Sequence, residues 1–473
     1  MTEILNSDET RLGRGIIRQC QAHPEQSGFF PLVQGSEAFL ARIRLAEIAD
    51  RNIDVQYYFI VDDVTGVLFI DALLQAADRG VHVRLLLDDV RTKGKDLGLA
   101  ALDAHPQFEI RIFNPFSRRE LRFFDVVTDF DRVNRRMHNK SITVDKQVTI
   151  VGGRNIGDEY FDARADLNFG DLDLLGVGPI AQDVSTAFEQ YWRSKAAVPI
   201  ESFAKYRGDQ ASLTKLREQF TRRVESAMET DFATAATTEF DYGLEDGSLQ
   251  LDWAPAELVY DLPDQVAAQM GRQLRPMIET SMELLLVSPY FVPQADGVAM
   301  FSELCRHGGR VVVVTNSLAS TDVAAVHAGY ARYREEIVKA GVELWEIKPD
   351  LETRRMPTMR IGSSRSSLHA KFFIRDRQQM LVGSFNWDPR SIRINTEMGI
   401  LVHSDEIAAP FAGQLLSRLP EFAYRVTLND KGRLQWLYEA KGESRVFDRE
   451  PQTGFWRRAT AAIFGLFPFE GQL

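Results

Sequence analysis

"RMHNKSITVD", residues 136–145, places His138 two residues before Lys140 and ends at Asp145. The same residue types recur at the same spacing in "SLHAKFFIRD", residues 367–376, as His369, Lys371 and Asp376. The sequence contains only eight histidines, so chance is a poor explanation for two copies of the pattern. The two copies indicate a structural unit that occurs twice and each time presents an imidazole beside an ammonium group.

The repeat extends beyond these three residues. The matching positions are His138, Lys140, Asp145, Gly152 and Asn155 in the first copy and His369, Lys371, Asp376, Gly383 and Asn386 in the second, all at a constant offset of 231 residues. Five matches without a gap indicate an internal duplication of the chain.

Each motif is preceded by a strand, helix, strand pattern. "VHVRLLLDD" (81–89) and "RVVVVTN" (310–316) are continuous apolar runs typical of fully buried strands, and the segments before them have helical periodicity. We therefore expect the α/β fold class, as a duplicated α/β sandwich whose two halves are related by pseudo-twofold symmetry. The predicted boundaries are an N-terminal half over 1–200 with its core from about residue 31, a polar linker or surface excursion over 201–249, a C-terminal half over 250–420 and a C-terminal tail over 421–473.

The bulk composition restricts the class of protein. A chain of 473 residues is too long for one hydrophobic core, and it has no apolar run of the length that a membrane span needs. The first thirty residues lack the pattern of a secretory signal, and two cysteines are too few for a disulfide framework, so we expect a reducing cytosol. A net charge of −11 argues against a protein that binds nucleic acid through a broad positively charged surface.

The chemistry follows from the alternation of a strand. In "HNKSITV" His138 and Lys140 point to the same face, and His369 and Lys371 do so in "HAKFFI". If the halves meet about a pseudo-twofold axis, two imidazoles and two cations converge. The imidazoles can then act as nucleophile and as general acid and base, with the cations placed for an anionic group, which suits phosphoryl transfer.

The carboxylates of the site need separate treatment. Asp145 and Asp376 belong to the candidate catalytic set by their recurrence, but Asp145 lies about 16 Å beyond Lys140 along an extended strand and falls where a hairpin turn belongs. Their spacing favours a role in the turn or behind the reacting groups. Carboxylates that fix the imidazole tautomer are expected on the following strands, where Asp171 and Glu397 are the candidates, although polar residues at strand starts give the same pattern.

Small and neutral polar residues end the second strand of each motif. They are Gly152, Gly153 and Asn155 in the first copy and Gly383, Ser384 and Asn386 in the second. Small residues let the backbone and a hydroxyl approach a ligand oxygen, and the amides add neutral donors, so we expect phosphate or substrate binding here. For the glycines, a bulge or tight turn explains the pattern equally well.

A further candidate lies in "STDVAAVHAGYARYREEIVKAG", residues 320–341. The pattern predicts a helix capped near Thr321 or Asp322 that carries His327, Tyr330 and Arg334 along one side. Contact of these three side chains with a substrate head group is a hypothesis.

The duplicated motif resembles the HKD signature of the phospholipase D superfamily, and both copies are complete. Within that superfamily, "RRMHNKSITVDKQVTIVGGRNIGDEYF", "VGSFNWDPRSIRINTEMG" and the C-terminal "EPQTGFWRRATAAIFGLFPFEGQL" are similar to bacterial cardiolipin synthases, most closely the C type. The resemblance implies two phospholipase D-like halves and a mechanism without metal or other cofactor. It also implies a phosphohistidine intermediate, for which we expect His138 as nucleophile and His369 as acid and base, although the near-symmetry of the copies leaves the reverse assignment open.

The implied reaction transfers a phosphatidyl group to phosphatidylglycerol and forms cardiolipin. Lys140, Lys371, Asn155 and Asn386 would hold the phosphoryl oxygens. The donor would be a second phosphatidylglycerol or phosphatidylethanolamine. The alternatives are a phospholipase D hydrolase that releases phosphatidic acid, a phosphodiesterase or nuclease, and a lipid-binding protein without activity.

The C-terminus bears on the expected partners, which are phospholipids and a membrane surface rather than nucleic acid. "FWRRATAAIFGLF" (455–467) places Trp456, Ala459, Ile463 and Phe467 on one helical stripe, as in an interfacial helix, although a terminal helix packed on the core gives the same pattern. By resemblance, we expect a peripheral protein on the cytoplasmic side of the bacterial inner membrane. Whether a small accessory membrane protein is a further partner is left open.

Overall fold

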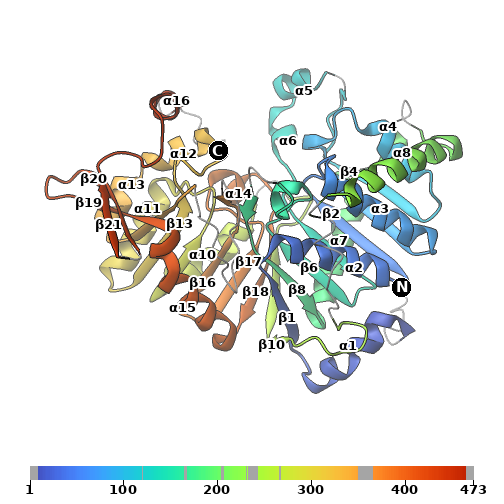
Figure 1. Cartoon of the computed structure of the whole chain (residues 1–473), viewed down its shortest axis with the longest axis horizontal. Coiled ribbons are helices and arrows are strands. Elements are labelled where there is room, and N and C mark those ends of the chain that lie inside the picture. The colour runs from blue at the N-terminus through green and yellow to red at the C-terminus, as the bar shows by residue number, and fades with distance from the viewer. Residues whose placement is uncertain are drawn as a thin grey trace.

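The computed structural model describes residues 9–119, 121–164, 168–203, 207–230, 232, 243–265, 268–349, 366–440 and 442–464. These residues form two α/β halves that lie side by side, each built around one large mixed sheet (Figure 1). The predicted fold class is therefore confirmed.

The sheet of the first half has the strand order β10-β1-β8-β6-β5-β2-β3-β4-β9. Its strands are β1 (Ser27–Leu32), β2 (Asn52–Tyr57), β3 (His82–Asp88), β4 (Phe108–Phe113), β5 (Ser141–Val144), β6 (Val148–Gly152), β8 (Asp173–Val177), β9 (Ala197–Pro199) and β10 (Asp252–Ala254). The helices of this half are α1 (Arg11–Ala22), α2 (Gly35–Ile48), α3 (Val64–Asp78), α4 (Asp96–Asp103), α5 (Arg122–Thr128), α6 (Phe130–Asn134), α7 (Pro179–Arg193) and α8 (Gln210–Met228).

The sheet of the second half has the order β11-β18-β17-β16-β12-β13-β14-β19-β20-β21. Its strands are β11 (Ala256–Tyr260), β12 (Glu283–Val287), β13 (Arg310–Asn316), β14 (Glu343–Ile347), β16 (Phe372–Arg375), β17 (Gln379–Gly383), β18 (Met398–His403), β19 (Ala423–Leu428), β20 (Leu434–Ala440) and β21 (Glu443–Phe447). The helices are α10 (Met270–Glu279), α11 (Gln294–Arg306), α12 (Ala324–Ala331), α13 (Arg334–Lys339), α14 (Pro389–Arg393), α15 (Asp405–Phe422) and α16 (Phe455–Phe464).

The duplication is visible in the topology. Strands β2 and β3 are parallel neighbours joined through α3, and β12 and β13 are parallel neighbours joined through α11. Each pair is followed along the chain by an antiparallel hairpin, β5–β6 in the first half and β16–β17 in the second, which carries the motif. The strand, helix, strand order expected from the sequence is present in both halves.

A shared apolar core joins the halves. Val151 and Leu174 of the first sheet belong to the same buried cluster as Val382 and Met398 of the second. Because β6 and β17 are the second strands of the two hairpins, this packing brings the two motifs to one interface.

The structure differs from the expected boundaries in three places. Strand β10 falls within 250–420, the range expected for the C-terminal half, but it joins the sheet of the first half. Within 201–249, which we expect to be a polar linker or surface excursion, α8 is a 19-residue helix that packs on α3 and α4 and begins with a capping box at Asp209. Within 421–473, which we expect to be a tail, β19, β20 and β21 extend the second sheet. Residues 233–242 of the predicted linker lie outside the described residues. Among the described helices, none combines the length and the apolar character that crossing a bilayer requires.

Candidate active site

Each histidine segment pairs with backbone of the opposite half. The backbone N–H of His138 donates to the backbone carbonyl of Thr396 at 2.9 Å. In the second copy, β15 (Ser366–Leu368) pairs in parallel with β7 (Asn168–Gly170), and the His369 N–H reaches the Gly170 carbonyl at 2.8 Å. The interface between the halves therefore holds both imidazoles in place.

Each imidazole also contacts a carboxylate of the opposite half. His138 Nδ1 lies 2.9 Å from Glu397 Oε2, and His369 Nδ1 lies 2.6 Å from Asp171 Oδ2. Both carboxylates are fully buried. A carboxylate at Nδ1 accepts that hydrogen and leaves the lone pair of the ring on Nε2, which is the tautomer that a nucleophile or base requires. The sequence indicated these two carboxylates, but it contained no sign that the pairs cross between halves.

The two lysines of the motifs are buried beside their histidines. Lys140 and Lys371 each donate from Nζ to the carbonyl oxygen of the histidine two residues earlier. Lys371 Nζ also lies 2.7 Å from His369 Nδ1. This nitrogen cannot donate to Asp171 and accept from an ammonium at once, so we assign its hydrogen to the ionised carboxylate and the lysine hydrogen to the carbonyl.

Burial dominates the electrostatics of the histidines and lysines. Burial, and then the Lys371 ammonium, lower the pKa of His369 to about 4, and burial with both lysines lowers the pKa of His138 well below its usual value. Burial also lowers the pKa of Lys371 to about 8, and that of Lys140 falls well below its usual range for the same reason. In the absence of a bound anion, both imidazoles are therefore neutral at pH 7.

The two carboxylates differ in their charge state. Burial raises the pKa of Glu397 to about 7. Burial alone would also raise the pKa of Asp171, but Lys371 and His369 outweigh it and lower the value below its usual range. The near-symmetric site is therefore electrostatically asymmetric, with an ionised carboxylate at His369 and a partly neutral one at His138.

Ser384 and the motif glycines serve these carboxylates rather than an open ligand position. The hydroxyl of Ser384 donates to Glu397, and Ser391 donates to the other oxygen of that carboxylate at 2.7 Å. A Cβ on Gly153 would lie 2.3 Å from Asp171 Oδ1, so glycine makes room for the orienting carboxylate. The expected contact of Ser384 and Gly153 with a ligand oxygen is therefore corrected, because intramolecular partners occupy both positions.

Asn155 and Asn386 are buried and have unused hydrogen-bonding capacity. Asn155 Nδ2 donates to the Tyr160 hydroxyl at 3.3 Å. Among the described residues, neither Oδ1 of Asn155 nor Oδ1 of Asn386 has a hydrogen-bond partner. Buried amide atoms without a partner are costly, and rotation of the amide by half a turn would direct an NH2 group to the same place, so both positions suit a bound oxyanion.

Asp145 and Asp376 hold the hairpin turns. Both have positive φ, 51° and 52°, as do the residues that follow them, which is the geometry of a two-residue hairpin loop. The Asp145 carboxylate accepts the backbone N–H groups of 50, 51 and 52, and Asp376 accepts those of 282 and 283. Their place in the candidate catalytic set is corrected accordingly, because they fix the starts of β2 and β12 and contact neither imidazole.

The head-group hypothesis for His327, Tyr330 and Arg334 is contradicted by their burial. Arg334 pairs with Glu346 and with Glu450, the latter at 2.7 Å, and His327 lies 2.8 Å from the Arg334 guanidinium. The Tyr330 hydroxyl donates to Glu346 at 2.8 Å. The predicted single helix is also divided into α12 and α13, with Val323 at the first N-cap. These side chains form a buried ionic network that packs the loop at residue 450 against α12 and α13.

Sequence reasoning missed an aromatic set around the imidazoles. The rings of Tyr58 and Tyr160 lie 5.0 Å from those of His138 and His369, and Tyr290 lies 6.4 Å from His369. The signal was present, because Tyr58 in "YYF" and Tyr290 in "PYF" follow the first parallel strand of each half.

Sequence reasoning also missed two polar residues that hold the histidine segments. Asp88, at the end of β3, accepts the Met137 N–H at 2.8 Å, and Asn316, at the end of β13, accepts the Leu368 N–H at 2.9 Å. Each therefore holds the residue directly before a histidine.

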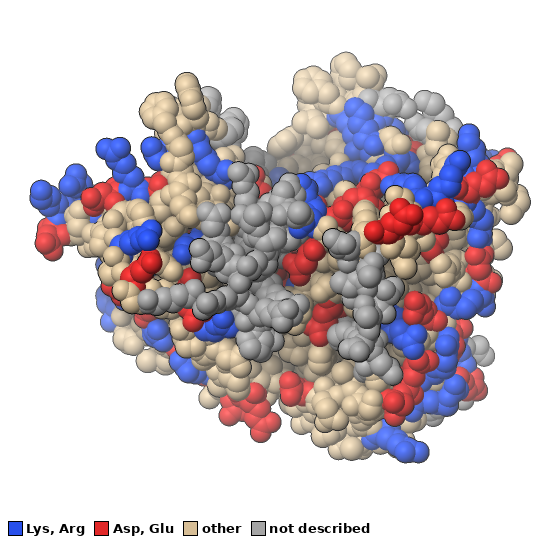
Figure 2. Space-filling view, viewed as in Figure 1, with Lys and Arg blue, Asp and Glu red and all other residues tan. Residues whose placement is uncertain are grey.

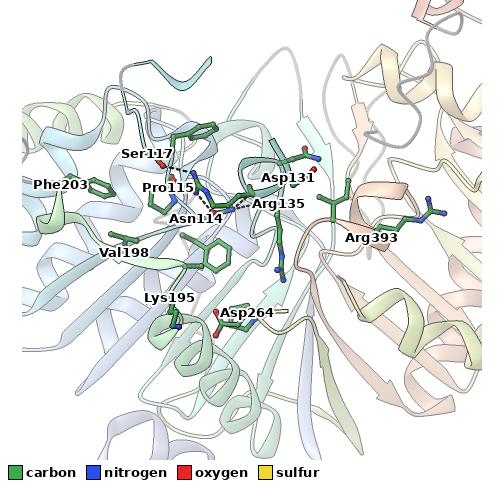
Figure 3. A pocket seen from close by; sticks show the side chains of 17 residues that line it. Asn114, Pro115, Ser117, Asp131, Arg135, Lys195, Val198, Phe203, Asp264 and Arg393 are labelled. Atoms are coloured by element: carbon green, nitrogen blue, oxygen red, sulfur yellow. Dashed lines mark hydrogen bonds between the residues drawn. The ribbon is translucent and has the colours of Figure 1, made fainter. Parts of the chain in front are cut away.

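A cavity of about 940 Å3 lies beside α6, between segments of the two halves (Figure 3). Apolar side chains such as Phe113 and Phe203 line it together with the cations Arg135, Lys195 and Arg393. Neither motif histidine is among its lining residues. The cavity therefore adjoins the segment that leads to His138 without containing either imidazole.

A duplicated α/β sandwich with a histidine and a lysine from each half at the interface defines a phospholipase D-like protein. The family model described as "Cardiolipin synthase, PLD-like domain" matches residues 40–192 and 274–418. Cardiolipin synthase C of Escherichia coli strain K12 is 42% identical over 97% of this chain and 99% of its own length. The chain belongs to the PLD-like cardiolipin synthase family.

Other relatives support the extent of the similarity. An uncharacterized protein of Helicobacter pylori strain J99 is 30% identical over 95% of this chain and 90% of its own length. The solved phosphatidylserine synthase of Haemophilus influenzae Rd KW20 superposes with a TM-score of 0.60 over 98% of this chain and 100% of that chain, at 12% identity. This last likeness shows that the fold is shared.

Proposed function

We propose that this chain is a phosphatidyltransferase that forms cardiolipin from phosphatidylglycerol and a second phospholipid. The similarity to a cardiolipin synthase C over nearly the full length of both chains supports this proposal. The observation that carries the chemistry is the pair of imidazoles, each held at Nδ1 by a buried carboxylate of the opposite half. Exchange at a phosphodiester needs one group that attacks phosphorus and another that moves the alcohol proton.

In the first step, Nε2 of His138 attacks the phosphorus of the donor phospholipid. An N–P bond forms, the bond from phosphorus to the head-group oxygen breaks, and protonated His369 gives its proton to that oxygen. Glycerol leaves if the donor is phosphatidylglycerol, and ethanolamine leaves if it is phosphatidylethanolamine. The product is a phosphatidyl group attached to His138.

In the second step, the glycerol hydroxyl of phosphatidylglycerol gives its proton to His369. Its oxygen attacks phosphorus, the N–P bond breaks, and cardiolipin leaves while His138 is regenerated. Lys140, Lys371, Asn155 and Asn386 would stabilise the charge on the phosphoryl oxygens in both steps.

The asymmetry of the carboxylates supports this assignment of roles. A general acid must carry a proton, and ionised Asp171 stabilises the imidazolium form of His369 once the anionic phosphodiester has bound. A nucleophile must be neutral, and Glu397, whose pKa is raised to about 7 by burial, stabilises a cationic His138 less.

We propose that the halves 1–200 and 250–420 form one catalytic unit and that neither is active alone. Each imidazole takes its orienting carboxylate from the other half, so a separated half would have a histidine without that partner. Separately expressed halves should make no cardiolipin, whereas mixing them should restore activity if they reassociate.

The proposed function is tested by incubating the purified protein with labelled phosphatidylglycerol, with and without phosphatidylethanolamine, and separating the lipid products. We expect the parent protein to form cardiolipin and both His138→Ala and His369→Ala to form none. An increase in cardiolipin on adding phosphatidylethanolamine would identify that lipid as the donor. Phosphatidic acid as the only product would show a hydrolase instead. No lipid product, together with cleavage of plasmid DNA, would show a nuclease.

The family similarity supports membrane association, and we propose that the protein acts peripherally at the cytoplasmic face of a bacterial inner membrane. The expected observation is release of the protein from isolated membranes by alkaline carbonate, together with protection from protease in intact spheroplasts. Digestion in intact spheroplasts would place it on the outer face.

A further inference from the structure

Helix α5 has its apolar side chains on the outside. Five apolar residues from 121 to 127 are exposed, with Phe123 at 73% and Val127 at 65%, and Phe130 of α6 is exposed as well. The buried side chain of this helix is Asp125, whose carboxylate accepts a hydrogen bond from the backbone N–H of Arg118 at 2.8 Å. A surface helix in water normally shows the reverse pattern, so α5 fits an environment that is apolar on its outer side.

The helix is attached to the active-site edge of the first sheet. Arg122 donates to the carbonyl and carboxylate of Asp89, at 2.7 and 3.0 Å. Asp89 follows Asp88, the residue that holds Met137 beside His138. The end of β3 therefore holds both α5, through Asp89, and the segment that contains His138, through Asp88.

Helix α16 occupies the corresponding place in the second half. Arg457 donates to the carbonyls of Leu318 and Thr321, in the loop that follows β13. Asn316 at the end of β13 holds Leu368 beside His369. Since β3 and β13 are equivalent strands of the two halves, the two helices attach to equivalent loops.

The outer side of α16 is exposed in the same way as α5. Phe455 and Trp456 are 68% and 80% exposed, and Ile463 is 57% exposed. Figure 1 shows α5 and α16 on the same side of the molecule, one on each half. Figure 2 shows two mainly uncharged projections at these places, with a hollow between them. Of the stripe expected to form an interfacial helix at the C-terminus, Trp456 and Ile463 are exposed, and Phe467 lies outside the described residues. Helix α5 is a counterpart that the sequence pattern did not indicate.

We propose that α5–α6 is a membrane-docking element and that it acts together with α16, so that the chain rests on a phospholipid bilayer through both halves. A bilayer is a flat, apolar partner able to contact two unrelated helices at once, and shallow burial of aromatic and aliphatic side chains is the usual mode of interfacial binding. The choice of a lipid surface over a protein rests on the proposed function, because the substrates of that reaction lie in a membrane.

The test measures sedimentation of the full-length protein with phosphatidylglycerol vesicles. In the double variant Phe123→Ser/Val127→Ser the partition coefficient between vesicles and water should fall about tenfold, because apolar surface that contacts the bilayer is lost. Met282→Ser is the matched control, because Met282 is 62% exposed but lies at the amino end of β12, away from the histidine segments, and it should change binding less than about twofold. Both variants should keep parental activity on dispersed short-chain phosphatidylglycerol.

A second measurement covers the case in which the double variant folds poorly. In a Trp456→Phe background, Phe123→Trp should give fluorescence that is quenched by vesicles of brominated phosphatidylglycerol. Absence of this added quenching, or unchanged sedimentation of the double variant, would overturn the proposal. So would a concentration-dependent dimer that the double variant abolishes, because α5 would then be a protein interface. Vesicle binding requires no turnover, so a failure of the proposed function would appear separately, as absence of cardiolipin with docking intact.

Discussion

Substitution of Asp145 by alanine tests whether the aspartate of the motif acts in chemistry or in folding. The carboxylate accepts three backbone N–H groups, at 2.8, 2.9 and 3.0 Å, where the chain enters β2. With each bond taken at about 1 kcal/mol because the donors are partly exposed, their loss costs about 3 kcal/mol. Alanine at φ 51° adds roughly 0.5–1 kcal/mol, since aspartate tolerates the left-handed region better. We expect a total loss of about 4 kcal/mol in the free energy of unfolding.

Chemical denaturation of Asp145→Ala and of the parent protein measures this loss, and activity is expressed per folded molecule. The expected kcat lies within about threefold of the parent, because the carboxylate contacts neither imidazole. Asp145→Asn is the matched variant: it keeps one acceptor oxygen and should lose about half as much stability. Unchanged stability with a fall in kcat of about a thousandfold would refute the reasoning, since the aspartate would then act on the reaction.

Three further predictions concern the site and the network at residue 450. Asp171→Asn should lower kcat by about 10^2–10^4-fold at nearly unchanged KM, because His369 loses its ionised Nδ1 partner; an unchanged kcat would contradict the assigned role. Burial lowers the pKa of Lys371 to about 8, so its positive charge is present below that pH and kcat/KM should fall above it. In Lys371→Arg this fall in kcat/KM should occur at a higher pH, because arginine keeps its charge. If the fall occurs at the same pH in both proteins, another group causes it. Arg334→Met should lower the free energy of unfolding by about 3–5 kcal/mol, because it leaves Glu346 and Glu450 buried without their cation, while the KM for phosphatidylglycerol stays within about twofold. A tenfold rise in KM at unchanged stability would restore the head-group hypothesis.

Local patterns were sufficient to predict the central parts of the fold. The buried strands β3 and β13 are continuous apolar runs, and the dipeptides at 145 and 376 mark the turns between the strands of each hairpin. The sheet edges were not predictable in this way. Strand β10 has three residues and pairs with β1, more than two hundred residues earlier, so its formation depends on a non-local partner rather than on its own sequence.

The site was predictable as a set of residue types but not as a set of contacts. Strand alternation places His138 and Lys140 on one face, but it cannot show that the carboxylate at His138 comes from the other half. Gly153 and Ser384 were assigned to a ligand because small residues allow close approach; here they allow and support the buried carboxylates Asp171 and Glu397.

The pattern around His327 was misread for a related reason. Helical periodicity shows that side chains share a face, but it does not show whether that face meets solvent, substrate or protein. In this chain Glu450, more than a hundred residues later, covers the face and neutralises Arg334. The exposed apolar face of α5 was missed because a seven-residue helix is too short to give a periodic signal.

The most direct test of the central claim, that His138 is the nucleophile and His369 the acid and base, is to trap the covalent intermediate. The parent protein and the variants His138→Ala and His369→Ala are mixed rapidly with phosphatidylglycerol, quenched in alkali to preserve phosphohistidine, and digested for mass spectrometry. A phosphatidyl adduct on the peptide that contains His138 is the predicted result for the parent protein. His138→Ala should form no adduct, and His369→Ala should form the same adduct more slowly because it lacks the general acid of the first step. An adduct on His369 that persists in His138→Ala would contradict the account and reverse the roles of the two histidines.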